Sequence, residues 1–212
     1  DPQNNQKWKG VVLYDATDQT LFEYIRISNS YTGGESNDHM KGGGLCLNNS
    51  NPIIVDCIIE NNVATLNDVG GGGGGVNCDM GSSPSITDVT IRSNTAEWGG
   101  GGINISDNSN PVITYVEIID NETSEVDGYG GGIAAEESSN PELTNVVIAG
   151  NTAYYGGACN FYILANAILT NVTISNNSAQ LYGGVSGHGS NLSLVNCILW
   201  DNADQEIFMS AG

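Results

Sequence analysis

The chain has 212 residues and a formal net charge of −19, from 24 acidic and 5 basic residues. Phosphate binding needs Lys and Arg side chains that displace counterions, so this charge argues against a nucleic-acid partner and against an anionic membrane surface. No apolar run is long enough to span a bilayer, so we expect no membrane insertion. The acidic surface suits cations and favours solubility of a long stack of strands.

The chain repeats one unit that has two halves. The first half begins with Ile or Leu, carries Val-x-Ile or a close variant in its middle, and closes on an Asn. In chain order its copies occupy residues 22–30 (a degenerate first copy), 54–62, 86–94, 113–121, 143–151, 169–177 and 194–202. From Asn62 to Asn202 the closing Asn recurs after 32, 27, 30, 26 and 25 residues. Fixed motifs at variable spacing indicate a constant coil with loops of different length.

The second half of the unit is a glycine run that ends in an apolar residue. Its copies end in Gly10-Val11, Gly44-Leu45, Gly75-Val76, Gly102-Ile103, Gly132-Ile133, Gly157-Ala158 and Gly184-Val185. Both halves contain short stretches rich in β-branched residues, bounded by Gly, Asn, Ser and Pro, which is typical of strands. Because side chains alternate along a strand, the apolar residues of Val-x-Ile share one face. No sustained 3.6-residue period is present, so helices are not expected.

A single coil of this kind cannot bury its apolar face alone. Coils stacked about 4.8 Å apart would pair every strand with its copies above and below. The sequence therefore predicts an all-β, single-stranded, right-handed parallel β-helix, a solenoid of about seven coils. We expect one domain over residues 1–212. The chain starts at Asp1 without a signal peptide, so we interpret it as a segment of a larger secreted protein.

Two kinds of corner residue recur in this register. Four prolines stand two residues before the Ile or Leu, and proline cannot donate to a sheet ladder, so Pro52, Pro84, Pro111 and Pro141 should mark one corner. Asn and Asp tolerate left-handed backbone, so we expect that conformation at two further corners. The first of these contains Asp56, Asp88, Asn145, Asn171 and Asn196. The second contains Asn62, Asn94, Asn121, Asn151, Asn177 and Asn202, whose stacked amides should form an asparagine ladder.

The five cysteines form no CxxC motif and no Cys/His cluster, so a zinc site is not supported. Cys57 and Cys197 take the place of inward valines and Cys78 that of an inward isoleucine, so we expect small buried side chains there. Cys46 and Cys159 are assigned to the neighbouring, outward-leaning place. Cys57 and Cys197 are too many coils apart for a bridge, and Cys46 and Cys78 point to opposite faces, so no disulfide is expected.

The pairing of a Gly-Gly-apolar strand with an x-x-x-Asn strand resembles the repeats of polymorphic outer membrane proteins and of large secreted bacterial surface proteins. Residues 131–134 (GGIA) match the first motif, and residues 118–121 (IIDN) and 148–151 (IAGN) match the second with Ile in place of Phe. Residues 196–200 (NCILW) resemble the end of such β-helices. The resemblance covers nearly the whole chain and implies a secreted or cell-surface location with a role in adhesion, surface coating or passenger display.

Many β-helix proteins degrade polysaccharides, so an enzyme of this kind is a competing interpretation of the sequence. A lyase needs a base beside a carboxylate, and no basic residue stands beside a repeated acidic cluster; the five are Lys7, Lys9, Arg26, Lys41 and Arg92. Residues 187–189 (GHG) match one motif of the pectin hydrolases of this fold, but the accompanying Asp-Asp and Arg-x-Lys are absent. Hydrolysis needs two facing carboxylates, which the sequence alone cannot bring together. We therefore predict no catalytic residue, and leave an enzyme as the alternative.

Cation binding is the sharpest hypothesis for a site. Asp120, Glu122, Glu125 and Asp127 concentrate oxygen ligands in one insertion, and Ca²⁺ favours such carboxylate-rich loops. Residues 35–38 and 67–68 are two further candidates. None of them matches the EF-hand or the glycine-rich nonapeptide calcium repeat, so a solvated loop is the competing interpretation.

Two functions stay open. The first is an extracellular structural or adhesive module, whose partners would be further copies of itself or neighbouring domains of a longer fibre. The second is a glycan-binding or glycan-degrading β-helix. Sugars could stack on the loop aromatics, which are Trp98, Tyr129, Tyr154, Tyr155 and Tyr182. A groove lined by carboxylates and a base would favour an enzyme, whereas flat ladders of Asn, Thr and Gly would favour a scaffold.

Overall fold

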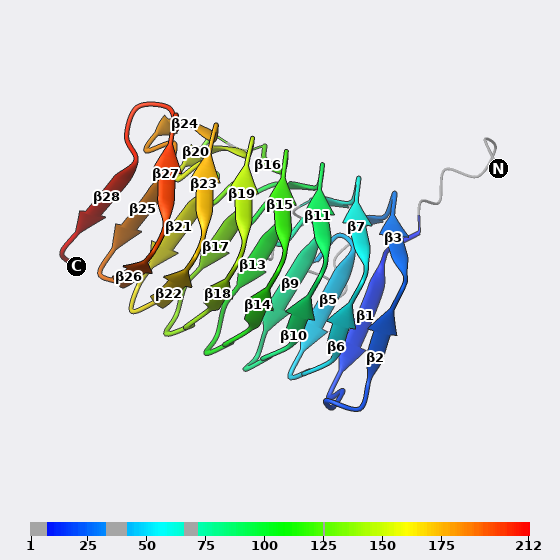
Figure 1. The fold of residues 1–212 in the computed structure, drawn as a ribbon. Helices are drawn as coiled ribbons and strands as arrows, with labels where there is room; N and C mark the ends of the chain where they lie inside the picture. Colours follow the sequence, from blue (N-terminus) through cyan, green and yellow to red (C-terminus); the bar gives the residue numbers. More distant parts are fainter. Residues whose placement is uncertain (1–7, 33–41, 66–71, 125) are drawn as a thin grey trace, which may run out of the picture.

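The computed structural model describes residues 8–32, 42–65, 72–124 and 126–212, and within these ranges it contains 28 strands and no helix. The strands form four sheets, here called A to D, in which every pairing is parallel and neighbours come from successive coils (Figure 1). The sheets hold eight, seven, seven and six strands. The prediction of an all-β, right-handed parallel β-helix of about seven coils is confirmed. No helix of the described residues could cross a membrane.

The strands of each sheet share a column of the repeat. Sheet A contains β1 (Val11–Tyr14), β5 (Leu45–Asn48), β9 (Val76–Asp79), β13 (Ile103–Ile105), β17 (Ile133–Ala135), β21 (Cys159–Tyr162), β25 (Val185–His188) and β28 (Ile207–Ser210). Sheet B contains β2 (Leu21–Glu23), β6 (Ile53–Val55), β10 (Ser85–Thr87), β14 (Val112–Thr114), β18 (Glu142–Thr144), β22 (Asn166–Thr170) and β26 (Asn191–Val195).

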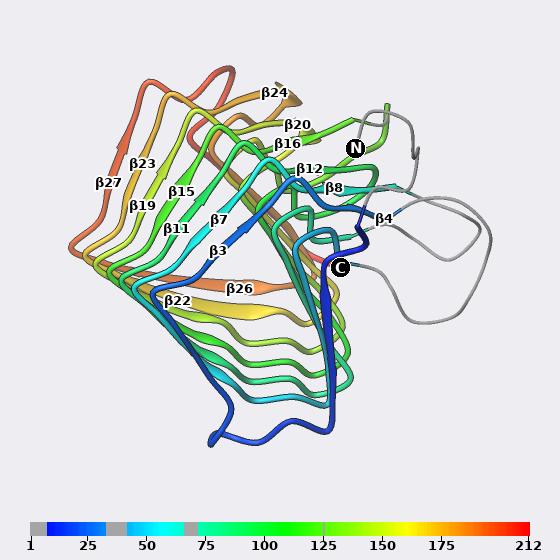
Figure 2. The ribbon, with the colours of Figure 1, turned by 90° about the vertical axis from the view of Figure 1, so that its right-hand side faces the viewer.

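The other two sheets complete the coil. Sheet C contains β3 (Arg26–Ser28), β7 (Ile58–Glu60), β11 (Thr90–Arg92), β15 (Glu117–Ile119), β19 (Val147–Ala149), β23 (Thr173–Ser175) and β27 (Ile198–Trp200). Sheet D contains β4 (Tyr31–Thr32), β8 (Val63–Ala64), β12 (Thr95–Ala96), β16 (Glu122–Thr123), β20 (Thr152–Tyr155) and β24 (Ser178–Leu181). In the view along the stack, the strands of sheet D extend away from the end of sheet C (Figure 2).

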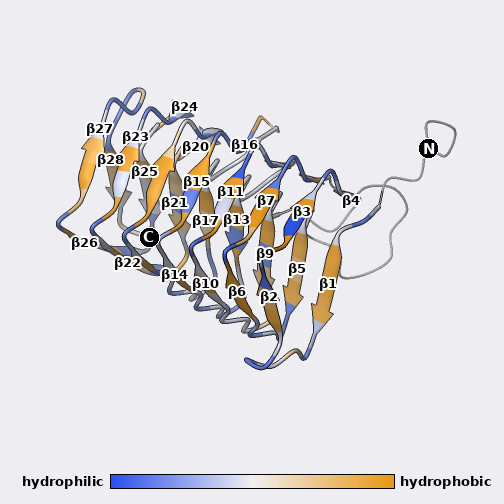
Figure 3. Ribbon diagram, turned by 45° about the vertical axis from the view of Figure 1, so that its right-hand side comes forward, coloured by the Kyte–Doolittle hydropathy of each residue, from blue (hydrophilic) through white to orange (hydrophobic). Residues whose placement is uncertain are grey.

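The core is a set of apolar columns that run along the stack. The middle residue of each sheet C strand points inward, as in Ile59, Ile91 and Ile118, which are fully buried and paired in register. Sheets A and B supply equivalent columns of Ile, Leu and Val. The strands are accordingly the most apolar parts of the coil and the corners the most polar (Figure 3). Stacking therefore buries the face that one coil would leave exposed.

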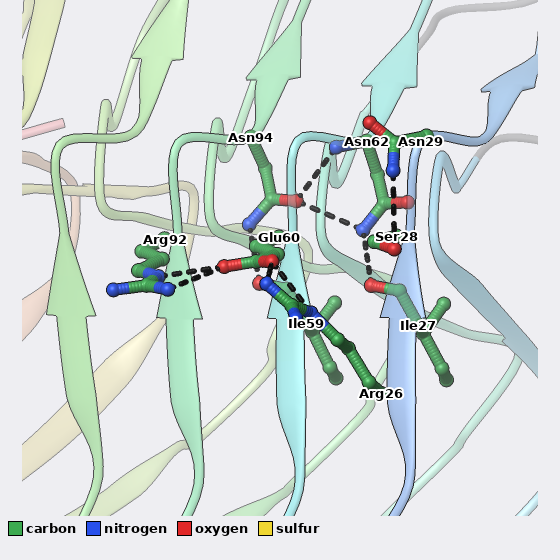
Figure 4. A network of polar contacts seen from close by, with 9 residues as sticks. All are labelled: Arg26, Ile27, Ser28, Asn29, Ile59, Glu60, Asn62, Arg92 and Asn94. Carbon is green, nitrogen blue, oxygen red and sulfur yellow. Dashed lines mark hydrogen bonds and ion pairs between the residues drawn. The ribbon is translucent and has the colours of Figure 1, made fainter.

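The predicted asparagine ladder lies at the corner between sheets C and D, here called the inner asparagine corner. Asn94 shows its bonding: its Nδ2 donates to the Ile59 carbonyl of the preceding coil and to Asn121 Oδ1 of the next coil, both at 3.0 Å. The Asn94 backbone N–H donates to the same Oδ1 at 3.0 Å. Figure 4 shows the equivalent bonds between Asn62 and Asn94. Each ladder amide from Asn62 to Asn177 thus joins three coils.

The reason for asparagine at this corner differs from the predicted one. The six ladder residues, from Asn62 to Asn202, do not adopt a left-handed backbone; the residue before each of them does. Those positions are Asn61, Ser93, Asp120, Gly150, Asn176 and Asp201. The ladder residues are instead at most 8% exposed, so they are selected for inward amides that satisfy buried backbone groups. The left-handed prediction is confirmed at the other corner, for example at Asp88 (φ 53°) and Asn145 (φ 56°).

The glycine run packs against this ladder. A Cβ on Gly102 would lie 2.6 Å from the Gly132 carbonyl oxygen and 3.2 Å from Asn121 Nδ2. Gly44, Gly75 and Gly132 have equivalent neighbours. The two halves of the sequence unit, glycine run and closing asparagine, are therefore two sides of one close contact.

The register corrects one of the predicted cysteine positions. Cys159 pairs with Ile133 and Val185, so it lies in the inward column of sheet A and is fully buried. Ala158 stands where the preceding coil has Gly132, the last glycine of its run, and taking Ala158 as the apolar residue shifted the alignment by one place. A shift of one residue reverses the face of a strand side chain.

Of the other four cysteines, three lie as predicted and Cys197 is more exposed than predicted. Cys57 and Cys78 are buried in the core, and Cys46 is buried in the outward column of sheet A. Cys197 is only half-buried. None of the five cysteines forms a disulfide, and burial raises the pKa of the Cys78 and Cys159 thiols well above the ordinary range. Such thiols are unreactive, which agrees with a role as core residues.

The prolines mark one corner, as predicted. Pro52, Pro84, Pro111 and Pro141 directly precede sheet B strands. Each Pro carbonyl accepts a bond from the next coil, for example from Ser85 N–H to Pro52 at 3.1 Å and from Val112 N–H to Pro84 at 3.0 Å. Proline therefore keeps its acceptor in the ladder and loses only a donor that the strand does not use.

Candidate functional site

A groove of about 450 Å³ opens on the outer face of sheet A in the C-terminal coils. Its floor consists of side chains from β21, β25 and β28, which are Asn160, Tyr162, Ser186, His188, Phe208 and Ser210, with Gly187 between them. Its wall comes from Asp127, Tyr129 and Tyr182 on the segments that lead from sheet D to sheet A, from Tyr155 at the end of β20, and from Glu136 just after β17. We call this cavity the aromatic groove.

The floor follows from strand alternation. In β21, Cys159 and Phe161 point into the core, so Asn160 and Tyr162 point outward. Parallel pairing stacks Asn160 on Ser186 and Tyr162 on His188. The Asn160 amide donates to Ser186 Oγ at 2.7 Å, and the Tyr162 and His188 rings stack with centroids 5.7 Å apart.

The last coil extends the floor. Ser186 pairs with Phe208 and His188 with Ser210. The His188 Nδ1 and Ser210 Oγ lie 2.8 Å apart. The Tyr182 ring lies flat on Phe208, with centroids 4.0 Å apart and an interplanar angle of 4°. Wall and floor are therefore held together by an aromatic contact.

The wall depends on a change of residue within one column. Gly72, Gly99, Tyr129 and Tyr155 are joined in that order by parallel bridges on successive coils. In the earlier coils the glycine packs directly against an outward side chain of sheet A, since a Cβ on Gly72 would lie 2.9 Å from the Asn104 side chain. The outward residues Asn77 and Asn104 are accordingly buried there. In the later coils tyrosine rings stand at this place and line the open groove.

Among the described residues that line it, the groove has two carboxylates and no Lys or Arg. Glu136 accepts a hydrogen bond from the Tyr129 hydroxyl at 3.4 Å. Burial, and then the charge of Glu136, raises the pKa of Tyr129 above the ordinary tyrosine range, so its hydroxyl stays protonated and neutral. Asp127 is exposed at the rim. Of the basic residues that the structure describes, Lys9, Arg26 and Arg92, none lines the groove.

The two arginines have another role. Both bind the buried carboxylate of Glu60 on sheet C (Figure 4): Arg92 Nη2 lies 2.7 Å from Glu60 Oε2, and Arg26 Nε donates to Oε1 at 2.7 Å. These bonds hold the pKa of Glu60 below its ordinary value, against the effect of burial. The triad spans three consecutive coils, so it links neighbouring strands of sheet C.

The predicted calcium ligands are spread over different parts of the coil. Asp120 occupies the left-handed position before Asn121, Glu122 lies on β16 and accepts a bond from Thr95 Oγ1 at 3.2 Å, and Asp127 lines the groove. Glu125 and the candidates at 35–38 and 67–68 lie outside the described residues. Within the described ranges no three Asp, Glu, His or Cys side chains are grouped so as to hold a metal. The calcium site stays a prediction.

The sequence-based prediction covered part of the groove. Tyr129, Tyr155 and Tyr182 were candidate sugar-stacking residues and line it; Trp98 and Tyr154 do not. It missed Tyr162, whose outward direction follows from alternation once Cys159 is placed inward. It also missed Glu136 and Phe208, for which the register of neighbouring coils was needed. His188 of the Gly-His-Gly match lies in the groove beside Ser210 and Tyr162.

Comparison with known proteins gives one match. A family model described as a right handed beta helix region matches residues 3–162. Neither the comparison with curated proteins nor the comparison with solved structures gave a match.

Proposed function

Because the chain belongs to the right-handed β-helix family, we propose that it is a rigid, non-catalytic module of a secreted or cell-surface protein, and that it adheres by holding a glycan in the aromatic groove. The observation that carries this proposal is the groove itself, with the rings of Tyr129, Tyr155, Tyr162, Tyr182 and Phe208 gathered in one cavity. Binding sites for small ligands are typically apolar cavities with a few placed polar groups.

The chemistry of the lining suits a sugar. Aromatic side chains offer an apolar face next to a polar tip, and a pyranose ring has an apolar C–H face and a rim of hydroxyls. Carboxylate, amide and hydroxyl groups surround the rings and can bond to such hydroxyls; they belong to Asp127, Glu136, Asn160, Ser186 and Ser210. The floor strands are locked by ladder pairing to their neighbours, which reduces the ordering cost of binding.

The structural part of the proposal rests on the ladders. The inner asparagine corner, the core columns and the Glu60 triad all connect successive coils and leave little freedom between them. The likeness of residues 131–134 and 118–121 to polymorphic outer membrane protein repeats supports a surface location. In that setting, further copies of the chain or neighbouring domains of a longer fibre are the partners that we propose.

The test is binding to a panel of oligosaccharides by isothermal titration calorimetry, with Tyr162→Ala as the groove variant. Tyr162 is 41% exposed and its ring stacks on His188, so its removal should weaken sugar binding without disturbing the core. The matched control is Tyr115→Ala, an exposed tyrosine at the corner between sheets B and C. We expect binding that Tyr162→Ala weakens at least about fivefold and Tyr115→Ala leaves unchanged. Absence of binding to every glycan would refute the proposal.

Degradation of the bound glycan is a second candidate. Asp127, Glu136 and His188 line the same groove, and hydrolysis of a glycosidic bond uses two carboxylates on either side of it. The same panel would be assayed for new reducing ends over long incubation. We expect none; release that Glu136→Gln abolishes would make the module an enzyme instead.

A further inference from the structure

The electrostatics of the aromatic groove are one-sided. Its charged groups are the carboxylates of Asp127 and Glu136, and none of the described Lys or Arg residues lines it. Arg26 and Arg92 are engaged with Glu60 on sheet C, and Lys9 precedes β1 at the opposite end of the stack. The chain as a whole carries −19. A cleft lined by one sign of charge concentrates ligands of the other sign.

The aromatic rings of the groove also favour positively charged ligands. The face of a tyrosine or phenylalanine ring is the negative part of its quadrupole, so it attracts an ammonium group placed over it. Tyr162 is 41% exposed, and the groove brings Tyr129, Tyr155 and Tyr182 to the same cavity. Ammonium groups would therefore meet both ring faces and carboxylates there.

The rim supplies an available partner for a cation. Asp127 is exposed, and it forms no hydrogen bond or ion pair with other residues in the described part of the chain. An anionic sugar would meet this carboxylate and Glu136 without a described Lys or Arg beside them, and like charges brought together at an interface oppose binding.

From this juxtaposition of tyrosine rings and two carboxylates, with no Lys or Arg among the described lining residues, we infer that the groove selects glycans that carry free amino groups, such as β-linked glucosamine oligomers, over neutral and anionic glycans. The inference rests on the proposed glycan-binding function and names its ligand class. The apolar sugar faces stack on the rings, and the protonated amines lie against Asp127, Glu136 and the ring faces.

The experiment compares three hexasaccharides with the same linkage: the glucosamine hexamer, its fully N-acetylated form, and the glucose hexamer. Affinities are measured by calorimetry at a pH at which the amines are protonated, at low and at high salt. We expect the affinity for the glucosamine hexamer to be at least about five times the affinity for either of the other two. High salt should reduce this difference. Asp127→Asn and Glu136→Gln should each lower the ratio of the affinity for the glucosamine hexamer to the affinity for either other hexamer toward one.

The control is Glu142→Gln, which makes the same charge change on an exposed residue of β18 in sheet B, outside the groove. It should leave the ratio unchanged; an equal loss would mean that the overall negative charge attracts the amines, and would overturn the inference. A lysine hexapeptide that binds as tightly as the glucosamine hexamer would overturn it as well. Equal binding of all three hexamers refutes the amine preference but not the proposed function, whereas binding of none refutes the proposed function.

Discussion

The inner asparagine corner and the aromatic groove are built by the same coils under opposite rules. At the corner, asparagine recurs in six successive coils. The first five donate from Nδ2 to the Oδ1 of the next asparagine at 2.8–3.0 Å, and the last, Asn202, donates to Glu206 instead. On the outer face of sheet A, no single residue type is kept at the paired positions, which hold Cys, Asn, Ala and Ser. Going along the stack they are Cys46, Asn77, Asn104, Ala134, Asn160 and Ser186.

The difference separates stability from recognition. A repeated inward amide satisfies the buried backbone groups that every turn of the coil leaves at the same place. An outward side chain satisfies no buried backbone group, so its residue type can vary from coil to coil. In the column of Gly99 and Tyr129, glycine is replaced by tyrosine in the later coils, and the groove opens there. Variants at the corner should therefore change the free energy of unfolding, and variants in the groove should change binding.

The largest effect is expected for Asn121→Ala. Asn121 is fully buried; its Nδ2 donates to Ile91 O and Asn151 Oδ1, and its Oδ1 accepts from the N–H and side chain of Asn94. Alanine would leave several buried groups without partners, at about 1–3 kcal/mol each. We expect a loss of about 3 kcal/mol or more in the free energy of unfolding, measured by urea denaturation followed by circular dichroism.

Asn166→Ala is the matched control for the corner. Asn166 belongs to an exposed asparagine ladder and donates to Asn140 Oδ1 at 2.8 Å and Leu164 O at 2.9 Å. Water can replace these bonds, so the loss should stay below about 1 kcal/mol. Equal losses for the two variants would contradict the view that burial gives the inner corner its importance.

An intermediate effect is expected for Glu60→Gln, and it should depend on pH. The pKa of Glu60 is lowered in the folded chain, mainly by its bonds to Arg26 and then to Arg92. A lowered folded pKa gives stability that is complete above the ordinary carboxyl pKa of 4.5 and is lost as the pH falls through the folded value. At neutral pH the free energy of unfolding of the wild type should exceed that of the variant by on the order of 1 kcal/mol. The difference should be no larger, because both arginines are about half exposed and water screens their charges.

Thermal unfolding midpoints of wild type and Glu60→Gln, measured from neutral pH to strongly acidic pH, test this prediction. The two curves should converge at the acidic end. Glu117→Gln, an exposed position on the same sheet, should follow the wild type throughout. Curves that stay parallel would show that the ionised Glu60 does not contribute through its arginines.

The smallest effect on stability is expected in the groove. Tyr162→Ala removes a side chain that is 41% exposed and whose main aromatic contact is His188. The free energy of unfolding should therefore change by less than about 1 kcal/mol. The same variant should lose sugar affinity in the calorimetric test. A large loss of stability with no change in binding would reverse the comparison between the two regions.

Much of the fold could be predicted because each anchor of the repeat has a local physical reason. Pro111 cannot donate to a ladder, Asp88 tolerates a left-handed backbone, and Ile118 must face the core in a Val-x-Ile strand. The prediction failed where two local explanations competed. Asn was expected in the left-handed position of the inner corner, but that position falls one residue earlier, because the ladder needs the amide to point inward.

The sequence by itself determined the coil: its period, its apolar inward face, its corners and the absence of cysteine pairing all follow from residue types at fixed spacing. Only the tertiary structure decided which face Cys159 and Tyr162 take, that Arg26 and Arg92 meet at Glu60, and that aromatic rings from separate coils enclose one groove. The physical reason is that the coil is a local pattern, whereas the groove depends on the register between coils. A shift of one residue in that register exchanges the inside for the outside.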